Sequence, residues 1–239
     1  MTNSLEIAAW DSDFFGYPIG KIRAEQISIE KLKALKEQSS AGGIKLVYLF
    51  ADPSDDVSNH AAEMAGAERA DQKVVFFMNT GGIPVSETDE HIELYQSSTP
   101  TPQLISLSIQ SGLYSRYKLD PNFKNHEFER LYTAWVENSV NKKIADYTYV
   151  YKEENTVLGF VTLKIDGKRG QIGLIAVDEG SRGKSIGKKL VYAVINLLKQ
   201  KQVTELDVAT QSANMDACNF YGKIGFEVIS RENIYHIWF

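Results

Sequence analysis

The sequence has almost no cysteine, no long apolar run and only scattered histidines. Cys218 is the single cysteine among 239 residues, which excludes an internal disulfide and is typical of a reducing compartment. No apolar stretch approaches the ~20 residues that span a bilayer, and Met1–Trp10 has Glu6 but no basic residue, unlike a secretory signal. The four histidines lack metal-ligand spacing. We therefore expect a cytoplasmic protein with no metal site and no membrane insertion.

Net charge is small and negative, but its distribution is uneven. The chain carries a formal charge of −5, which argues against a general nucleic-acid binder. Between Lys164 and Lys201 the balance is +6, so the rest of the chain sums to −11. A basic segment in an acidic chain favours a localised anionic ligand, although a solvated, lysine-rich helix face is the alternative.

Strand and helix patterns alternate along the chain, which predicts an α/β protein with a mixed α+β sheet. In the first third, Leu5–Trp10 is expected to be a strand, and Ser28 is expected to cap a helix that runs to Gln38. The cluster Asn79–Pro84 then breaks the pattern with two glycines and a proline. We predict two domains, a smaller one over residues 1–82 and a second over residues 83–239.

The second domain contains a longer series of predicted elements. The spacing of apolar residues predicts an amphipathic helix over Glu127–Val140, followed by three strands in an antiparallel meander. Later helices are predicted over Lys188–Lys201 and Met215–Lys223. The predicted strands are Ala145–Lys152, Val157–Asp166, Gln171–Val177, Val203–Ala209, Phe226–Ser230 and Ile234–Phe239.

The end of the third meander strand and the turn after it carry the strongest chemical indication. The apolar run Ile172–Val177 leads into Arg182-Gly-Lys-Ser-Ile-Gly187, which opens the next helix. Backbone N–H groups at a helix N-terminus can converge on a pyrophosphate, and the helix dipole favours its negative charge. The two glycines allow close approach, and the arginine and lysine add positive charge. This pattern predicts a phosphate-binding turn.

The turn resembles that of the GNAT (Gcn5-related N-acetyltransferase) superfamily, whose pattern there is R/Q-x-x-G-x-G/A. Ser185 stands where glycine is usual, and a serine keeps its backbone N–H available. The resemblance implies a GNAT fold in the C-terminal domain, an acetyl-CoA donor, and a catalytic Val177 N–H that polarises the thioester carbonyl, worth roughly 2.7–4 kcal/mol. The implied acetyl-CoA contacts are Ile175, Ala176, Val177, Arg182, Gly183, Lys184, Ser185, Ile186, Gly187, Lys188 and Asn214.

A tyrosine on the last predicted helix extends the resemblance. Tyr221 stands where the family has the acid that protonates the departing coenzyme A thiolate. Asn214, two helical turns earlier, stands where the family holds the pantetheine arm. A core tyrosine with a satisfied hydroxyl is the alternative. Cys218 lies on the same helix, but no activating histidine is near it in sequence, so a buried structural thiol is favoured over a covalent acyl-cysteine route.

Segments outside the turn suggest the acyl acceptor. Trp10–Gly16, Ala134–Val140 and Leu206–Asn214 resemble the TDP-fucosamine acetyltransferases, and the likeness runs over most of the chain. Those enzymes acetylate the 4-amino group of dTDP-4-amino-4,6-dideoxy-D-galactose for cell-surface polysaccharide such as lipopolysaccharide. They pair a smaller, degenerate GNAT-like N-terminal domain with a complete C-terminal one. A hydrophobic plug between domains is the alternative for Trp10–Gly16.

The resemblance also implies acceptor contacts. In that family, Ser111–Asn122 would border the acceptor pocket, where Tyr114 and Tyr117 stack on thymine or a sugar face and Arg116 pairs with the diphosphate. Phe15 is the fourth implied contact. An ordinary charged loop is the alternative for this segment. No side-chain base is identified from the sequence. An acceptor amine with a pKa of about 7.7–8.0 is partly neutral at cytosolic pH, so a strong base is not obligatory.

Together with these patterns, the resemblance implies an acetyl-CoA-dependent N-acetyltransferase that acts on a dTDP-linked 4-amino-4,6-dideoxyhexose by direct attack in a ternary complex. Two alternatives stay open. One is acetylation of another small amine or of a protein N-terminus, and the other is a non-catalytic acyl-CoA-binding module. The expected partners are acetyl-CoA and the nucleotide-linked amino sugar, and the resemblance implies a homodimer.

Overall fold

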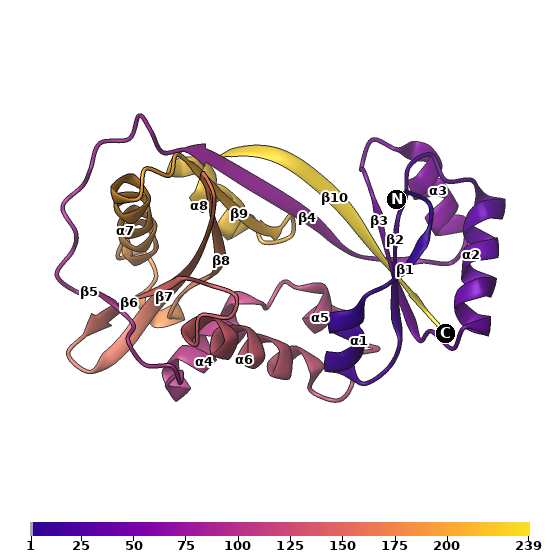
Figure 1. Ribbon diagram of the computed structural model, residues 1–239, viewed down its shortest axis with the longest axis horizontal. Helices are drawn as coiled ribbons and strands as arrows, with labels where there is room; N and C mark the ends of the chain where they lie inside the picture. The colour runs from indigo at the N-terminus through magenta and orange to yellow at the C-terminus, as the bar shows by residue number, and fades with distance from the viewer. Residues whose placement is uncertain (1) are drawn as a thin grey trace. The chain divides into compact units, whose positions relative to one another are not determined.

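The computed structural model describes residues 2–239, which form two compact units (Figure 1). Unit 1 takes the residues up to Val74 with Gln211–Ala213 and Ser230–Phe239, and unit 2 takes Val75–Thr210 and Asn214–Ile229. Two long strands, β4 (Glu68–Asn79) and β10 (Glu227–Trp238), pass from one unit to the other. Both units are therefore discontinuous in the chain, whereas the predicted domains 1–82 and 83–239 are continuous segments.

Unit 1 contains a four-strand arrangement in the order β1-β2-β3-β10, in which β2 and β3 are parallel. Its other elements are β1 (Leu5–Ile7), α1 (Ala9–Phe15), β2 (Ile19–Arg23), α2 (Ile29–Ala41), β3 (Leu46–Ala51) and α3 (Asp56–Met64). Ser28 caps α2 by accepting the Lys31 N–H at 3.2 Å, as predicted. Leu32, Leu49 and Ile237 belong to the buried core of this unit.

Unit 2 has strands in the order β4-β9-β8-β7-β6-β5. Helix α7 packs against β6, β7 and β8, α4 packs against β7 and β8 as well, and Figure 1 shows these helices on opposite sides of the strands. The elements are β5 (Ile92–Leu94), α4 (Pro102–Ser111), α5 (Arg116–Leu119), α6 (Glu127–Val140), β6 (Tyr147–Glu153), β7 (Thr156–Asp166), β8 (Arg169–Val177), η1 (Glu179–Ser181), α7 (Ile186–Gln200), β9 (Glu205–Gln211) and α8 (Met215–Lys223). The mixed α/β fold class and the antiparallel meander β6-β7-β8 are as predicted.

The predicted elements near the two ends of the chain differ from the structure. Leu5–Trp10 was expected to be one strand, but the strand ends at Ile7 and α1 occupies Ala9–Phe15. Gly16, at φ 81°, ends this helix in the left-handed conformation, and the Gly16 N–H donates to Ser12 O. The expected pair of C-terminal strands is the single strand β10, because the polar residues between them continue the extended backbone.

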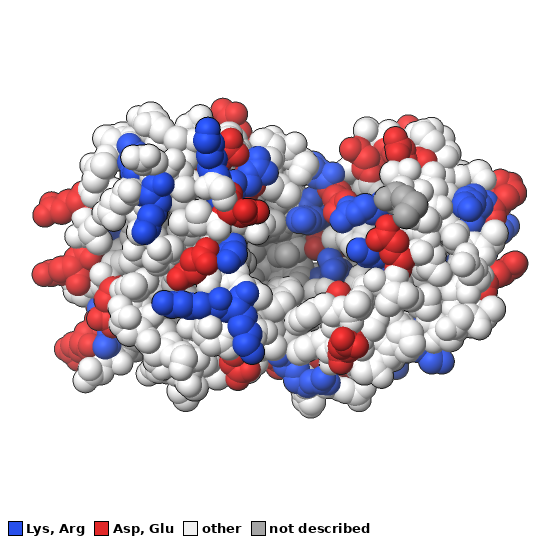
Figure 2. All heavy atoms as spheres, viewed as in Figure 1, with Lys and Arg blue, Asp and Glu red and all other residues white. Residues whose placement is uncertain are grey.

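The surface carries both signs of charge. In Figure 2 lysine and arginine side chains alternate with aspartate and glutamate over the face that is drawn, without a broad area of one sign. None of the helices within residues 2–239 combines the length and the apolar character that a bilayer crossing needs.

Candidate active site

Strands β8 and β9 of unit 2 separate partway along their length. Their parallel pairing runs from Arg169 opposite Glu205 to Ile172 opposite Val208. Within residues 2–239 no further β8–β9 pair follows, although β8 continues to Val177 and β9 to Gln211. Backbone N–H and C=O groups need partners wherever water is excluded. The end of β8 is therefore an edge that another extended chain can join.

An extra residue in β8 accompanies this separation. Val161 of β7 lies opposite Ile175, but Leu163 lies opposite Ile172, so two steps along β7 match three along β8. The Leu174 N–H at this bulge donates to the Oγ1 of Thr162 at 2.8 Å, and Thr162 is buried. A bulge bends its strand and increases its twist. The bulge thus turns the end of β8 away from its regular course.

The Val177 N–H faces the open edge. The Asp178 N–H donates to Leu158 O at 2.8 Å, and hydrogen-bonded and non-hydrogen-bonded pairs alternate in an antiparallel ladder. The neighbouring pair, Val177 opposite Gly159, is therefore of the non-hydrogen-bonded kind, and its Val177 N–H points away from β7. The Val177 carbonyl accepts a bond of 3.4 Å from Arg182 Nε.

The predicted phosphate-binding turn joins η1 to α7. Gly183 and Ser185 both have left-handed backbone conformations, with φ 81° and 62°. Ser185 is the N-cap of α7 but makes no side-chain capping bond. It therefore adopts a conformation that glycine adopts without strain. Its backbone, together with the first turn of α7, leaves N–H groups of the kind that bind phosphate.

The turn, the end of β8 and α8 meet at Gly187. A Cβ placed on this glycine would lie 3.3 Å from the Phe220 ring and 3.6 Å from Val177 Cγ2. Phe220 directly precedes Tyr221 on α8. The fold therefore brings together three of the segments that the sequence singled out, and glycine permits their close approach.

Tyr221 is buried, and its ring lies among phenylalanine rings. The ring centroids of Phe76 and Phe220 are each 5.3 Å from that of Tyr221, and the centroid of Phe226 is 5.6 Å away. Burial raises the pKa of the Tyr221 hydroxyl above its ordinary value, with a smaller contribution from Cys218. The hydroxyl therefore stays protonated at neutral pH, as a general acid must. Cys218 itself is half-buried.

Asn214 begins α8. Its Oδ1 accepts the Ala217 N–H at 3.2 Å, so the side chain caps the helix that carries Tyr221. A role of Asn214 in holding the pantetheine arm stays a prediction.

The basic residues near the turn have different surroundings. Arg182 and Lys184 are exposed, and Lys188 Nζ lies 5.5 Å from the centroid of the Tyr192 ring. Lys189 is instead paired with Asp89, at 2.8 Å from Nζ to Oδ2. The Lys189 side chain holds the pKa of that carboxyl down, at about 2. The Lys189 side chain therefore forms its ion pair with the segment that precedes β5.

The predicted acceptor residues fall in both units. In unit 2 the Tyr114 side chain is exposed, whereas the Tyr117 ring is buried against Phe123 and Trp135. Arg116 Nη2 donates to the Tyr117 hydroxyl at 2.7 Å. Phe15 lies in unit 1, where it is buried next to the rings of Phe14 and Tyr17.

In unit 1 the parallel pair β2–β3 has no open edge. All five residues of β2, Ile19 to Arg23, pair with residues of β3. In the turn before α2, the Gln26 N–H donates to Asp55 Oδ2 at 2.8 Å, and Gln26 Nε2 donates to Asp55 Oδ1 at 2.7 Å. The Asp55 carboxylate therefore accepts hydrogen bonds from the backbone and the side chain of Gln26 in this turn.

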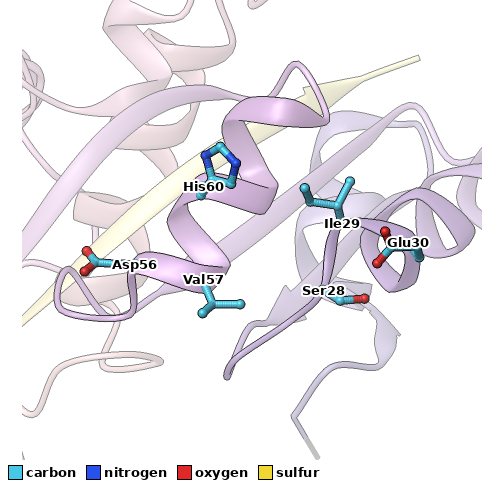
Figure 3. A pocket seen from close by; sticks show the side chains of 6 residues that line it. All are labelled: Ser28, Ile29, Glu30, Asp56, Val57 and His60. Carbon is cyan, nitrogen blue, oxygen red and sulfur yellow. The ribbon is translucent and has the colours of Figure 1, made fainter.

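A shallow hollow of about 500 Å³ lies beside the N-termini of α2 and α3 (Figure 3). It is lined by Ser28, Ile29, Glu30, Asp56, Val57 and His60. Two of these six side chains are carboxylates, so the hollow does not suit an anionic ligand. Within residues 2–239, no three His, Cys, Asp or Glu side chains gather in a way that would hold a metal ion.

Two residues of the site were not singled out from the sequence. Thr162 lies inside the predicted strand Val157–Asp166, and Phe76 lies in β4; a threonine and a phenylalanine are ordinary in strands. Their contacts with Leu174 and Tyr221 depend on pairing between distant segments, so the sequence carried no local signal for either.

Several known proteins are similar to this chain. The family model described as Acetyltransferase (GNAT) family matches residues 111–226. The spore coat polysaccharide biosynthesis protein SpsD of Bacillus subtilis is 25% identical over 65% of this chain and 55% of its own length. The dTDP-fucosamine acetyltransferase of Escherichia coli O6:H1 is 26% identical over 95% of both chains.

Solved structures with the same fold include a GCN5-related N-acetyltransferase from Sphaerobacter thermophilus. It has a TM-score of 0.57 and 16% identity, over 87% of this chain and 66% of that one. A tandem GNAT protein from the clavulanic acid biosynthesis pathway has a TM-score of 0.53 and 15% identity, over 93% of this chain and 76% of that one. These matches confirm the predicted GNAT fold.

Proposed function

The chain is an acetyltransferase of the GNAT family, which uses acetyl-CoA, and from this premise we propose that it N-acetylates a dTDP-linked 4-amino-4,6-dideoxyhexose. The chemistry rests on one observation above all, the open edge of β8 with Val177 and α8 beside it. The acceptor rests on the likeness to dTDP-fucosamine acetyltransferase, which extends over 95% of the chain. A likeness to a polysaccharide biosynthesis protein points the same way.

The open edge of β8 supports binding of the pantetheine arm. Backbone groups of Gly173–Val177 can pair with the pantetheine amides as a neighbouring strand would. The N–H groups of the turn Arg182–Gly187 and of the first turn of α7 then receive the pyrophosphate. Lys189 is paired with Asp89, so Arg182, Lys184 and Lys188 supply the positive charge.

Direct attack uses Val177 and Tyr221. The acceptor nitrogen forms a bond to the thioester carbon, and the Val177 N–H stabilises the resulting oxyanion. The carbon–sulfur bond then breaks with its electron pair on sulfur, and the Tyr221 hydroxyl donates the proton that forms the coenzyme A thiol. The proton lost from the acceptor nitrogen passes to solvent, from which Tyr221 is reprotonated.

The loop before α6 supports an acceptor site in unit 2. Leu113, Tyr114 and Leu119 are exposed there, although their side chains are large and apolar or aromatic. We assign the stacking contact to the exposed Tyr114. Because the Tyr117 ring is packed, its hydroxyl orients Arg116 towards the diphosphate. The substrate contact of Phe15, the cytoplasmic location and the homodimer stay predictions.

A thiol-release assay tests the proposal. Acetyl-CoA is offered with the dTDP-linked 4-amino sugar, with UDP- and GDP-linked amino sugars, and with unlinked small amines. We expect turnover to be fastest with the dTDP-linked sugar. Equal turnover with unlinked amines would favour a small-amine acetyltransferase. A lack of turnover with every sugar nucleotide would remove the acceptor assignment, and failure to bind coenzyme A in calorimetry would remove the donor site as well.

A further inference from the structure

The ring of Tyr221 is enclosed by residues from separate segments of unit 2. Phe76 comes from β4, and Phe226 comes from the segment between α8 and β10. Both are 4% exposed, and Tyr221 itself is 3% exposed. The Phe226 ring makes an edge contact with Tyr221, and the Phe76 ring is tilted against it at 46°. These contacts restrict how the Tyr221 ring can turn.

Phe76 differs from the other two rings in its origin. Phe220 is the neighbour of Tyr221 on α8, and the Phe226 N–H donates to Tyr221 O at 3.0 Å, so both are tied to the same helix. Phe76 belongs to a different element and fixes the ring relative to the sheet. An acid that serves a departing sulfur must be held within a fraction of an ångström, because small displacements cost large factors in rate.

We propose that Phe76 is a positioning residue for the proton-transfer step, because its ring holds the Tyr221 ring in the orientation that delivers the hydroxyl to the leaving sulfur. This inference rests on the acid role proposed for Tyr221. Phe76 touches neither substrate and acts through Tyr221. The same packing keeps water from the ring, which maintains the raised pKa of the Tyr221 hydroxyl. The titratable group that also acts on Tyr221 is Cys218 of α8.

A double-mutant cycle tests this role. Phe76→Leu removes the ring but keeps an apolar side chain, and Phe128→Leu is the matched control, because Phe128 is also 4% exposed and contacts Tyr132 on α6. Phe76→Leu is expected to lower kcat about tenfold, within the range for general acid catalysis, and to leave the KM for acetyl-CoA within about twofold of its original value. In a Tyr221→Phe background the same change should have no further effect on kcat. Phe128→Leu should keep kcat.

The outcomes separate the inference from the proposed function. An unchanged kcat in folded Phe76→Leu, or an equal loss of kcat in the Tyr221→Phe background, would overturn the positioning role. If the wild-type chain releases no thiol with any acceptor, the proposed function fails, and NMR of ¹³C-labelled tyrosine decides for Phe76. Phe76→Leu should then speed the ring flips of Tyr221 while Phe128→Leu does not, and an unchanged flip rate would overturn the inference. Phe76→Met serves in both experiments if the leucine variant does not fold.

Discussion

Thr162→Val removes one buried hydroxyl and tests whether the bulge in β8 creates the donor site. Thr162 is 1% exposed, and its Oγ1 accepts the Leu174 N–H at 2.8 Å. Valine has nearly the same shape but accepts no hydrogen bond, so a buried N–H is left without its partner. That change costs about 1–3 kcal/mol of unfolding free energy. The melting temperature should fall by about 2–4 °C for each kcal/mol.

The same substitution should weaken binding of coenzyme A. Without the Thr162 hydroxyl, the Leu174 N–H can form a regular ladder hydrogen bond with β7 if the register shifts by one residue. Such a shift reverses the two faces and edges of the end of β8, so that the Val177 N–H would point towards β7. We expect the Kd for acetyl-CoA to rise about tenfold, which corresponds to about 1.4 kcal/mol. Isothermal titration calorimetry measures the affinity, and chemical denaturation measures the stability.

Thr148→Val is the matched control. Thr148 lies opposite Thr162 on β6 and is 4% exposed, but within residues 2–239 its Oγ1 has no hydrogen-bond partner. The control should therefore leave affinity unchanged and stability unchanged or slightly raised. Wild-type affinity and stability in Thr162→Val would refute the reasoning, as would equal losses in the two variants.

Three further substitutions probe the site and its support. Tyr221→Phe should lower kcat tenfold or more in the thiol-release assay while coenzyme A still binds in calorimetry, and an unchanged kcat would remove Tyr221 from the mechanism. Ser185→Gly should raise the unfolding free energy by about 0.5 kcal/mol, because relief of the left-handed strain exceeds the cost of the added conformational entropy of the unfolded chain. A lower unfolding free energy in urea denaturation would contradict this. Asp89→Asn should cost about 1 kcal/mol at neutral pH, since the pair with Lys189 is partly exposed. The pKa of Asp89 is lowered from 3.8 to about 2, so the difference in unfolding free energy between wild type and variant should shrink as the pH falls through that interval. A difference that stays constant with pH in urea denaturation would count against the ion pair.

Local patterns predicted the elements with strong local signals. The helices Glu127–Val140 and Met215–Lys223 have the predicted bounds, and Ser28 is the predicted cap. These features depend on residues three or four apart in the chain, so their physics is local. Helix α1 was missed because its aromatic residues continue an apolar strand-like run, and its end depends on the left-handed Gly16.

The segments that form the candidate site could be predicted from the sequence, but their arrangement in space could not. The turn Arg182–Gly187 stands out in the sequence by its glycines and positive charges, and Tyr221 stands out by the resemblance to the GNAT superfamily. The separation of β8 from β9 accompanies an extra residue in the pairing of β7 with β8, and pairing of that kind is not encoded by either strand alone. For the same reason the role proposed for Phe76 depends on the contact between β4 and α8, which neither segment encodes alone.

The chain contains the parallel strand–helix–strand arrangement twice, and only one copy is open at its strand end. In unit 1 every residue of β2 is paired with β3. In the turn before α2, Asp55 accepts hydrogen bonds from the backbone and the side chain of Gln26. In unit 2 the pairing of β8 with β9 ends at Ile172, and the Asp178 carboxylate accepts the Gly180 N–H of η1 at 3.1 Å, whereas within residues 2–239 no carboxylate accepts an N–H of the segment Gly183–Gly187. Backbone N–H and C=O groups are satisfied within the chain, by water or by a ligand. Under the proposed function, the backbone groups that unit 1 satisfies within itself correspond to those that unit 2 would offer to acetyl-CoA, so that two similar arrangements would provide one donor site.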